Sequence, residues 1–349
     1  MMRHRLFRLA LGAVLPLGAI AAPVIDFPTD NRALIEGKPQ DFFMYVDRNF
    51  EGEQSKPWQG GQYGYVRGPV RQGDKVAYIQ IHEGVDIRPL ERDAQGNPLD
   101  AVRAAAAGRV VYISQLPSAS NYGRYVVIEH REGGSPFYTL YAHLAGINVQ
   151  PGDTVQQGQK IGQMGFTGAG INRERAHVHF EVCLMLSRHY EAWHSTVFPS
   201  DANRHGLYNG MNLVGADPSR FLVEASKNPS LTWRGYVQSL DPAFKIAIRN
   251  LPGFDLIRNY PWLVPAGQPA NPKSWIVTFS RHGVPIKVEA SDQQIAVAQA
   301  VWVKNTGETL KQLTKGYMAG TTTNPQLTDS GQRFARLLEG PNSTIAPAP

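Results

Sequence analysis

The sequence is poor in cysteine, with Cys183 as its single example among 349 residues. One cysteine cannot close an intrachain disulfide, so the fold must be stabilised by its core even in an oxidising compartment. A hydrophobic content of 42% is ample for such a core and argues against disorder as the main state. Val182 and Leu184 flank the cysteine, which predicts a buried thiol rather than a catalytic nucleophile.

The sequence also lacks a block of lysine and arginine with interleaved aromatic residues, so nothing in it indicates a nucleic-acid partner. The apolar run near the N-terminus, from about residue 6 to residue 20, is shorter than the roughly 20 residues that a membrane-spanning helix needs. It follows Arg3 and Arg5 and ends at Ala19-Ile20-Ala21, which fits a cleavage signal. We predict a signal peptide over residues 1–21, a periplasmic or secreted protein, and no stable membrane insertion after cleavage.

The positive charge of the chain is small once the predicted signal peptide is removed. The formal charge of +6 falls to +3 when Arg3, Arg5 and Arg8 leave with that segment. A mild positive balance suits an anionic cell envelope and does not specify a particular polymer. The length allows one large domain or two ordinary ones.

Short β-like runs separated by glycine and other turn residues fill the first half of the mature chain, among them "GRVVYIS", "GRYVVIEH", "FYTLYAHL" and "AHVHFEV". They predict an antiparallel β domain over residues 61–222, after an N-terminal extension over residues 22–60. The domain would close at "GADPSRFL", where Asp217-Pro218 can begin a helical turn. Residues 187–211 interrupt the pattern, and we predict a long inserted loop there.

The fold class is therefore predicted as mainly β, with a smaller C-terminal α+β region over residues 223–340. "SWIVTFSRHGVPIKVEAS" alternates like a hairpin, and Asp329 to Glu339 has the apolar spacing of a helix. Residues 341–349 are predicted as a disordered tail. Four tryptophans of this region could form a glycan-stacking surface, but a small core is favoured; they are Trp233, Trp262, Trp275 and Trp302.

The stretch "IHEGVDIRP", from Ile81 to Pro89, begins like the zinc-protease signature H-E-x-x-H, but its fifth position is Asp86. Gly84 and the nearby proline disfavour a helix, so we expect an extended segment. His82 and Asp86 then share one side of the chain, with Gly84 leaving space between them. Glu83 faces the other way and is predicted to be a solvated or structural carboxylate.

A second group of ligand atoms lies in "HVHFE". On a strand, His177, His179 and Glu181 share one face. A catalytic zinc ion takes three protein ligands and keeps a fourth position for water. His82, Asp86 and one histidine of the pair could supply that set, which leaves the other histidine and His143 to transfer protons and stabilise an oxyanion.

Together, His-x-x-x-Asp, "YAHL" and "HVHFE" resemble the motifs of the lysostaphin/LytM-type zinc metallopeptidases, a family of peptidoglycan endopeptidases. The resemblance covers about residues 61–222. It implies that His82, Asp86 and His179 bind one zinc ion per chain and that His143 and His177 are the catalytic pair, with either as the base. The implied activity is hydrolysis of peptide bonds in peptidoglycan stem peptides or cross-bridges by attack of metal-bound water.

Two departures from the family pattern bear on the substrate groove. The lead into "HVHFE" contains Arg173, Glu174 and Arg175 in place of a short run of small residues. The predicted insertion contains further histidines, expected to be exposed rather than part of a second metal site: His189, His194 and His205. His130 is predicted to be structural, and Tyr141 is an even choice between groove and core.

Two other functions remain open. The same fold could serve a non-catalytic or autoinhibited regulator of another cell-wall hydrolase, with the N-terminal extension or the insertion covering the groove. "VQPGDTVQQGQKIGQMG" also resembles the turns of biotinyl or lipoyl carrier domains. A carrier needs a modified lysine at a hairpin tip, whereas Lys160 lies beside an apolar strand residue, which disfavours this function.

Overall fold

The computed structural model describes residues 24–341. The predicted signal peptide and, apart from Pro341, the predicted tail lie outside the described residues. The fold is mainly β with antiparallel sheets, which confirms the predicted class. The strands before the C-terminal region are β1 Arg48–Phe50, β2 Glu53–Ser55, β3 Gly64–Gln72, β4 Lys75–His82, β5 Val85–Ile87, β6 Ala101–Arg103, β7 Gly108–Ser114, β8 Tyr125–Glu132, β9 Ser135–Ala142, β10 Gly146–Ile147, β11 Thr154–Val155, β12 Lys160–Gln163, β13 Val178–Met185 and β14 Leu213–Ala216.

Fewer residues are helical, and most of the helices are short. The α-helices are α1 Pro39–Phe42, α2 Tyr190–Val197, α3 Pro218–Lys227, α4 Trp233–Gln238, α5 Leu256–Asn259, α6 Leu310–Leu313 and α7 Asp329–Glu339. The 3-10 helices are η1 Trp58–Gly61 and η2 Pro261–Leu263. Within residues 24–341, no helix is both long and apolar enough to cross a membrane.

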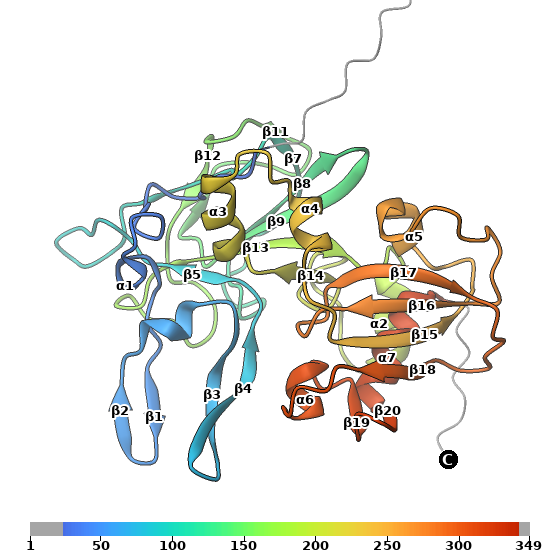
Figure 1. Ribbon diagram of the computed structural model, residues 1–349. Helices are drawn as coiled ribbons and strands as arrows, with labels where there is room; N and C mark the ends of the chain where they lie inside the picture. The colour runs from blue at the N-terminus through green and yellow to red at the C-terminus, as the bar shows by residue number, and fades with distance from the viewer. Residues whose placement is uncertain (1–23, 342–349) are drawn as a thin grey trace, which may run out of the picture.

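The main sheet has the strand order β11-β7-β8-β9-β13-β14, and β5 pairs with the start of β13 (Figure 1). β9 and β13 are buried along their whole length, in agreement with their short, nearly continuous apolar runs. Because side chains alternate between the faces of a strand, each face of the sheet contributes to its own apolar cluster. Cys183 lies in one of them and is fully buried, which confirms the buried thiol.

Two hairpins precede the main sheet. β1 pairs with β2 and β3 pairs with β4, and both hairpins project from the same side of the molecule (Figure 1). The register of β3 and β4 shifts between Tyr65 and Arg67, and Gly64 is paired with His82 at the base of the hairpin. A bulge of this kind bends the strand and redirects the side chains around it, so the hairpin brings Arg67 toward the end of β4.

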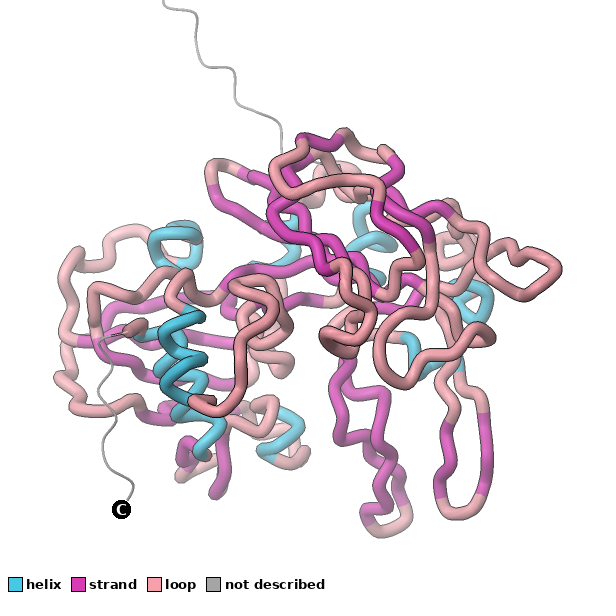
Figure 2. The backbone as a smooth tube through the Cα atoms, turned by 180° about the vertical axis from the view of Figure 1, so that it is seen from behind, coloured by secondary structure: helices cyan, strands magenta, loops and turns pink. Residues whose placement is uncertain are grey.

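The C-terminal lobe contains a sheet with the order β17-β16-β15-β18 and a small β19–β20 hairpin. Its strands are β15 Phe244–Arg249, β16 Ser274–Phe279, β17 Pro285–Ser291, β18 Gln299–Val303, β19 Met318–Gly320 and β20 Pro325–Leu327. α7 packs across this sheet (Figure 2), where Phe334 stacks on Tyr317 with ring centroids 4.2 Å apart. Glu339 of α7 forms an ion pair of 2.7 Å with Arg249 of β15.

The four tryptophans of the C-terminal region differ in exposure. Trp233 and Trp275 are buried, as expected of a core, while Trp262 is partly buried. Trp302 lies on the edge strand β18 and is 36% exposed, so the expectation of a core position is wrong for this residue.

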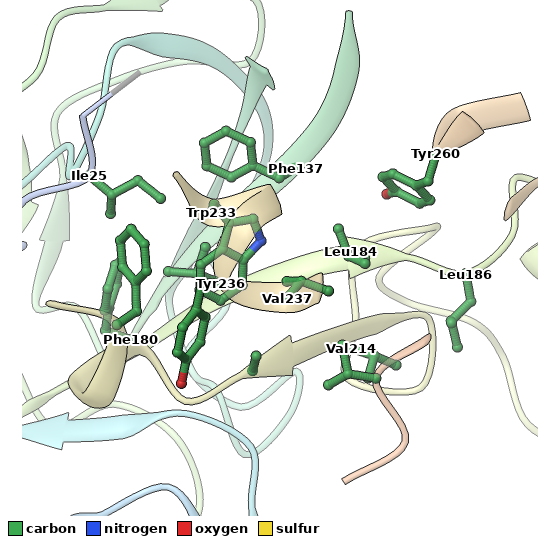
Figure 3. Packing of buried hydrophobic residues seen from close by; sticks show 14 of the residues in the cluster. Ile25, Phe137, Phe180, Leu184, Leu186, Val214, Trp233, Tyr236, Val237 and Tyr260 are labelled. Carbon is green, nitrogen blue, oxygen red and sulfur yellow. The ribbon is translucent and has the colours of Figure 1, made fainter. Parts of the chain in front are cut away.

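The two lobes share a continuous apolar core. Trp233, Tyr236 and Val237 of α4 pack near Leu184 and Val214 of the main sheet (Figure 3). The predicted boundary between residues 222 and 223 falls inside α3, whose N-cap is the side chain of Asp217. The division of the chain into domains stays a prediction.

Residues 190–197, within the segment predicted as an inserted loop, form α2. The apolar side chains of this stretch are spaced three and four residues apart, at Tyr190, Trp193 and Val197, which is the period of a helix face. The rest of the segment after α2, from residue 198 to residue 211, is irregular. Polar and glycine-containing sequence follows this single helical repeat, so the repeat is too short to predict a helix by itself.

Candidate metal centre

The stretch from His82 to Asp86 is extended, as predicted, and it packs against β13. β4 ends at His82, β5 begins at Val85, and β5 pairs Asp86 with His179. A Cβ atom at Gly84 would lie 2.5 Å from the carbonyl oxygen of Phe180 and 2.8 Å from His179 Nε2. Glycine therefore permits the close approach of β13, and the space expected beside Gly84 is filled by that strand.

Three buried side chains bring ligand atoms to one point. Asp86 Oδ1 lies 3.0 Å from His82 Nε2 and 3.0 Å from His179 Nδ1, and these two nitrogens are 3.0 Å apart. Within residues 24–341, this is the one group of three histidine, cysteine or acidic residues whose geometry could surround a metal ion. The sequence had singled out the same three residues, and their role as ligands stays a prediction.

Hydrogen bonds on the far side of each ring fix which nitrogen carries the proton. His82 Nδ1 donates to the Gln62 carbonyl at 2.7 Å, and His179 Nε2 donates to Glu181 Oε1 at 2.8 Å. When both rings are neutral, the nitrogens that face Asp86 are lone-pair acceptors. Three acceptors within contact of one another repel unless a proton or a metal cation lies between them, so the set fits a zinc ion with two imidazoles and one carboxylate.

The pKa values indicate the same preference for positive charge. Burial disfavours the imidazolium of His179, but hydrogen bonds to Asp86 and Glu181 outweigh it and raise the pKa of His179 to about 9. Burial would raise the pKa of Asp86, but the neighbouring His177, His82 and Arg67 bring it well below its ordinary value. Asp86 is therefore ionised at neutral pH and available as a ligand.

His143 and His177 lie beside this cluster, with ring centroids 4.7 Å apart. Each ring is fixed through Nδ1, which donates to the Thr167 carbonyl at 2.9 Å in His143 and to the Arg175 carbonyl at 2.6 Å in His177. Nε2 of His143 is therefore the nitrogen that can accept a proton, while Nε2 of His177 lies 3.3 Å from Asp86 Oδ1. Burial, followed by the nearby His177 and His179, lowers the pKa of His143 well below its usual value, so this imidazole is neutral at neutral pH.

The backbone also places His143 in an unusual way. It follows the last residue of β9 and has a φ of 65°, a left-handed conformation that is uncommon outside glycine. Its N–H donates to the Tyr122 carbonyl at 2.9 Å. The turn ends the alternation of β9, so Tyr141 does not share a face with His143. Tyr141 is fully buried and accepts a hydrogen bond from the Ala105 N–H, and the groove alternative is wrong.

Three further side chains lie against the cluster or against its partners, and the sequence motifs give them no role. Arg67 Nη2 donates to Asp86 Oδ2 at 2.5 Å, and its Nε donates to the Gly60 carbonyl. Glu181 is fully buried and accepts from His179 and from the Tyr122 hydroxyl at 2.7 Å. The shared face of β13 pointed to Glu181. No local pattern could identify Arg67 or Tyr122, which come from other segments.

Two residues of the cluster, His82 and His179, line a groove of about 660 Å³, whereas Asp86, His143 and His177 are not among its lining residues. One wall comes from the insertion, and the opposite side comes from β3, β4 and the loop before β8. The lining residues are Arg67, Ile81, His82, Glu83, Ala119, Ser120, Asn121, Tyr122, His179, Glu181, Tyr190, His194, Asp201, Ala202, Asn203, Arg204, His205, Asn209, Gly210 and Met211. Arg173, Glu174 and Arg175 are not among them; Glu174 instead pairs with Lys56 at 2.8 Å.

The remaining histidines do not form a second cluster among the described residues. His189 lies 3.8 Å from Asp255, and His205 Nδ1 lies 3.0 Å from the Tyr125 hydroxyl. His194 is only 6% exposed, so the expectation of an exposed loop histidine is wrong there. His130 is buried with both ring nitrogens hydrogen-bonded, which agrees with a structural role.

Comparisons with known proteins identify the domain that carries this site. Residues 80–190 match Peptidase family M23. Relatives include an uncharacterized metalloprotease of Haemophilus influenzae, 32% identical over 32% of this chain and 21% of that protein. The peptidoglycan DD-endopeptidase ShyB of Vibrio cholerae is 34% identical over 46% of this chain and 31% of its own length. The murein hydrolase activator NlpD of Salmonella dublin is 34% identical over 26% and 22%.

The chain thus spans less than a third of the length of each of these relatives. Among solved structures, the catalytic domain of lysostaphin from Staphylococcus simulans is 24% identical over 46% of this chain and 88% of that one, with a TM-score of 0.28. The buried His-Asp-His cluster on the antiparallel sheet has a geometry that could hold a metal ion. The chain contains a domain of peptidase family M23, which confirms the resemblance seen in the sequence.

Proposed function

We propose that the protein is a zinc-dependent endopeptidase that hydrolyses peptide bonds in peptidoglycan stem peptides or cross-bridges. The observation that carries this proposal is the convergence of three possible ligand atoms, from His82, Asp86 and His179, beside two histidines whose rings are each fixed by a hydrogen bond from Nδ1 to a backbone carbonyl. A regulator with no catalytic role would not need both the ligand set and the proton acceptors.

In this proposal, each residue of the site would have its own chemical role. A zinc ion bound by the three ligands would polarise the substrate carbonyl and lower the pKa of water. His143 and His177, fixed through Nδ1, would accept and return the proton at Nε2 and stabilise the oxyanion. Arg67 and Glu181 would orient Asp86 and His179 through the oxygen or nitrogen that does not face the cluster.

The groove supports a polymeric substrate rather than a small molecule. Its lining extends from the ligands along the insertion to Asn209 and Met211, so a chain of several residues could bind beside the scissile bond. Export to the cell envelope, inferred from the N-terminal sequence, would bring the protein to peptidoglycan. Several relatives with cell-wall names support the same location.

A regulator of another wall hydrolase is the second candidate, because the relatives include proteins named murein hydrolase activators. Digestion of purified sacculi separates the two functions. With the zinc-loaded mature protein we expect new peptide termini in the released muropeptides, and none with His143→Ala. Products that are the same with wild type and His143→Ala, or absent from both while a second hydrolase is stimulated, would reject the peptidase and favour the regulator.

A further inference from the structure

The wall of the groove that comes from the insertion is attached to the C-terminal lobe. Half of the groove-lining residues belong to residues 190–211, starting with Tyr190 and His194 of α2. α2 and α7 are in contact, behind the C-terminal sheet in Figure 1 and in front of it in Figure 2. The two lobes therefore meet at the helix that begins this wall.

α2 presents different residues to the groove and to the lobe. Tyr190 and His194 are one helical turn apart and line the groove, while Trp193 donates from its indole Nε1 to the Arg333 carbonyl of α7 at 2.8 Å. The Trp193 ring also packs on Tyr190 with centroids 5.3 Å apart. A movement of Trp193 relative to α7 would therefore move the groove-facing side of the same helix.

Two further hydrogen bonds join the lobe to the chain that enters α2. The Tyr260 hydroxyl accepts from Met185 N–H at 2.8 Å, and Asp255 Oδ2 accepts from Arg188 N–H at 2.7 Å. Tyr260 is fully buried and Asp255 is 3% exposed, so both contacts are shielded from water. These acceptors fix the direction in which the chain leaves β13 before the helix starts.

The far end of the wall is attached to the main sheet instead. The hydroxyl of Tyr112 donates to the Arg204 carbonyl at 3.1 Å, and that of Tyr125 donates to the Tyr208 carbonyl at 2.8 Å. α2 has only eight residues, too few to be stable as a helix without tertiary contacts. Its position thus depends on the C-terminal lobe.

We propose that the C-terminal lobe is a positioning element of the substrate groove, acting through Trp193 and Asp255 on α2. This inference rests on the proposed peptidase function and adds that the lobe determines how the peptide is bound on one side of the scissile bond. Trp193 is a positioning residue: it contacts α7 and Tyr190, and it acts on substrate through Tyr190 and His194.

The test uses the zinc-loaded full-length protein, with Trp193→Ala, Trp193→Phe and Asp255→Asn compared against Thr196→Ala. Thr196 is exposed on α2 and its hydroxyl bonds only within the helix, so its variant is the matched control. Two quantities are measured: hydrogen exchange of the amides in residues 199–211, and kcat and KM on soluble cross-linked muropeptides.

We expect Trp193→Ala to raise KM about tenfold, since a displaced positioning wall weakens binding of the substrate. kcat should stay within about twofold of the wild-type value. A raised KM with an unchanged kcat is expected when the lost interaction stabilises the bound substrate and the transition state equally. Amides in residues 199–211 should exchange faster. Trp193→Phe and Asp255→Asn should show smaller effects in the same direction, and Thr196→Ala none.

Unchanged exchange and unchanged KM in Trp193→Ala would overturn the inference. An equal fall in kcat for all variants would also overturn it, because that indicates general loss of structure. If Trp193→Ala does not fold, the same two measurements on Asp255→Asn and Trp193→Phe test the inference. An inactive wild-type protein with a full complement of zinc would reject the proposed function, while the exchange measurement would still test the role of the lobe.

Discussion

Glu83 Oε1 lies 2.6 Å from Lys315 Nζ, which joins the residue next to His82 to the C-terminal lobe. Lys315 is 15% exposed in its side chain and Glu83 is 34% exposed, and the lysine has a left-handed φ of 54°. Glu83 is therefore a structural carboxylate, one of the two roles expected from the sequence. The glutamate that made the segment look like H-E-x-x-H instead connects the two lobes.

Lys315→Met should lower the free energy of unfolding by about 1–2 kcal/mol, because it leaves a partly buried carboxylate without its partner. Solvent around Glu83 keeps the loss below that of a fully buried pair. Denaturant unfolding measures the change, and Glu83→Gln/Lys315→Met should recover part of it. The matched control is Lys287→Met, which removes a more exposed pair with Glu289 and should change stability less. Equal effects for the two lysines would contradict the account.

Arg67→Met should shift the loss of zinc at low pH toward neutrality. Arg67 is one of the neighbours that lower the pKa of Asp86, so its removal raises that pKa and lets protons compete with the metal at a higher pH. Zinc content after dialysis at a series of pH values between 4 and 7 measures the shift. Arg71 lies on the same hairpin in an exposed pair with Glu51. Arg71→Met is therefore the control, and it should leave the pH profile of zinc content unchanged.

Glu181→Gln should weaken zinc binding by about tenfold to a hundredfold, the usual cost of losing a carboxylate partner of a histidine ligand. Glu181 accepts from His179 Nε2, and the amide replaces the charged acceptor by a neutral one of the same shape. Competition with a chromogenic chelator gives the affinity. Zinc affinity equal to that of the wild type would mean that Glu181 does not orient the ligand.

His282 predicts a pH dependence of stability that can be separated from the metal site. Burial, then the charges of Arg281 and Lys315, lower the pKa of His282 to about 3. Folding thus favours the neutral ring, so its contribution to stability is complete above pH 6.5 and is lost as pH falls toward 3. Relative to His282→Gln, the wild type should lose about 2 kcal/mol between pH 7 and pH 4.5. A pH-independent difference between the two proteins would contradict this.

The motifs at the candidate site were visible in the sequence because strand alternation places His82 with Asp86 and His177 with His179 at fixed spacings. That the motifs share one site was expected only from the family resemblance, and the pairing of β5 with β13, which brings them together, was not predicted. Arg67 and Lys315 could not be predicted, because each reaches the site from a segment whose position depends on long-range packing. The position of Tyr141 could not be decided from the sequence for a related reason: the turn at His143 interrupts the alternation of side chains along β9.

The C-terminal region shows the same limit. Its helix from Asp329 to Glu339 and its hairpin were predicted from local periodicity, and both are present. Trp193 and Arg333, which are hydrogen-bonded, lie 140 residues apart in the sequence, and no local pattern predicts their contact. The segment that forms α2 was predicted as a loop, because its short apolar repeat indicates a helix only when the positions of α7 and the groove on either side of it are known.

The central claim is that His82, Asp86 and His179 bind a catalytic zinc ion. The most direct measurement is hydrolysis of a defined cross-linked muropeptide during zinc titration of a sample verified to be metal-free. The account predicts no cleavage before zinc is added, a rise that reaches its plateau at about one equivalent per chain, and no rise in Asp86→Ala. Full activity in the metal-free protein, or a plateau unchanged in Asp86→Ala, would contradict it.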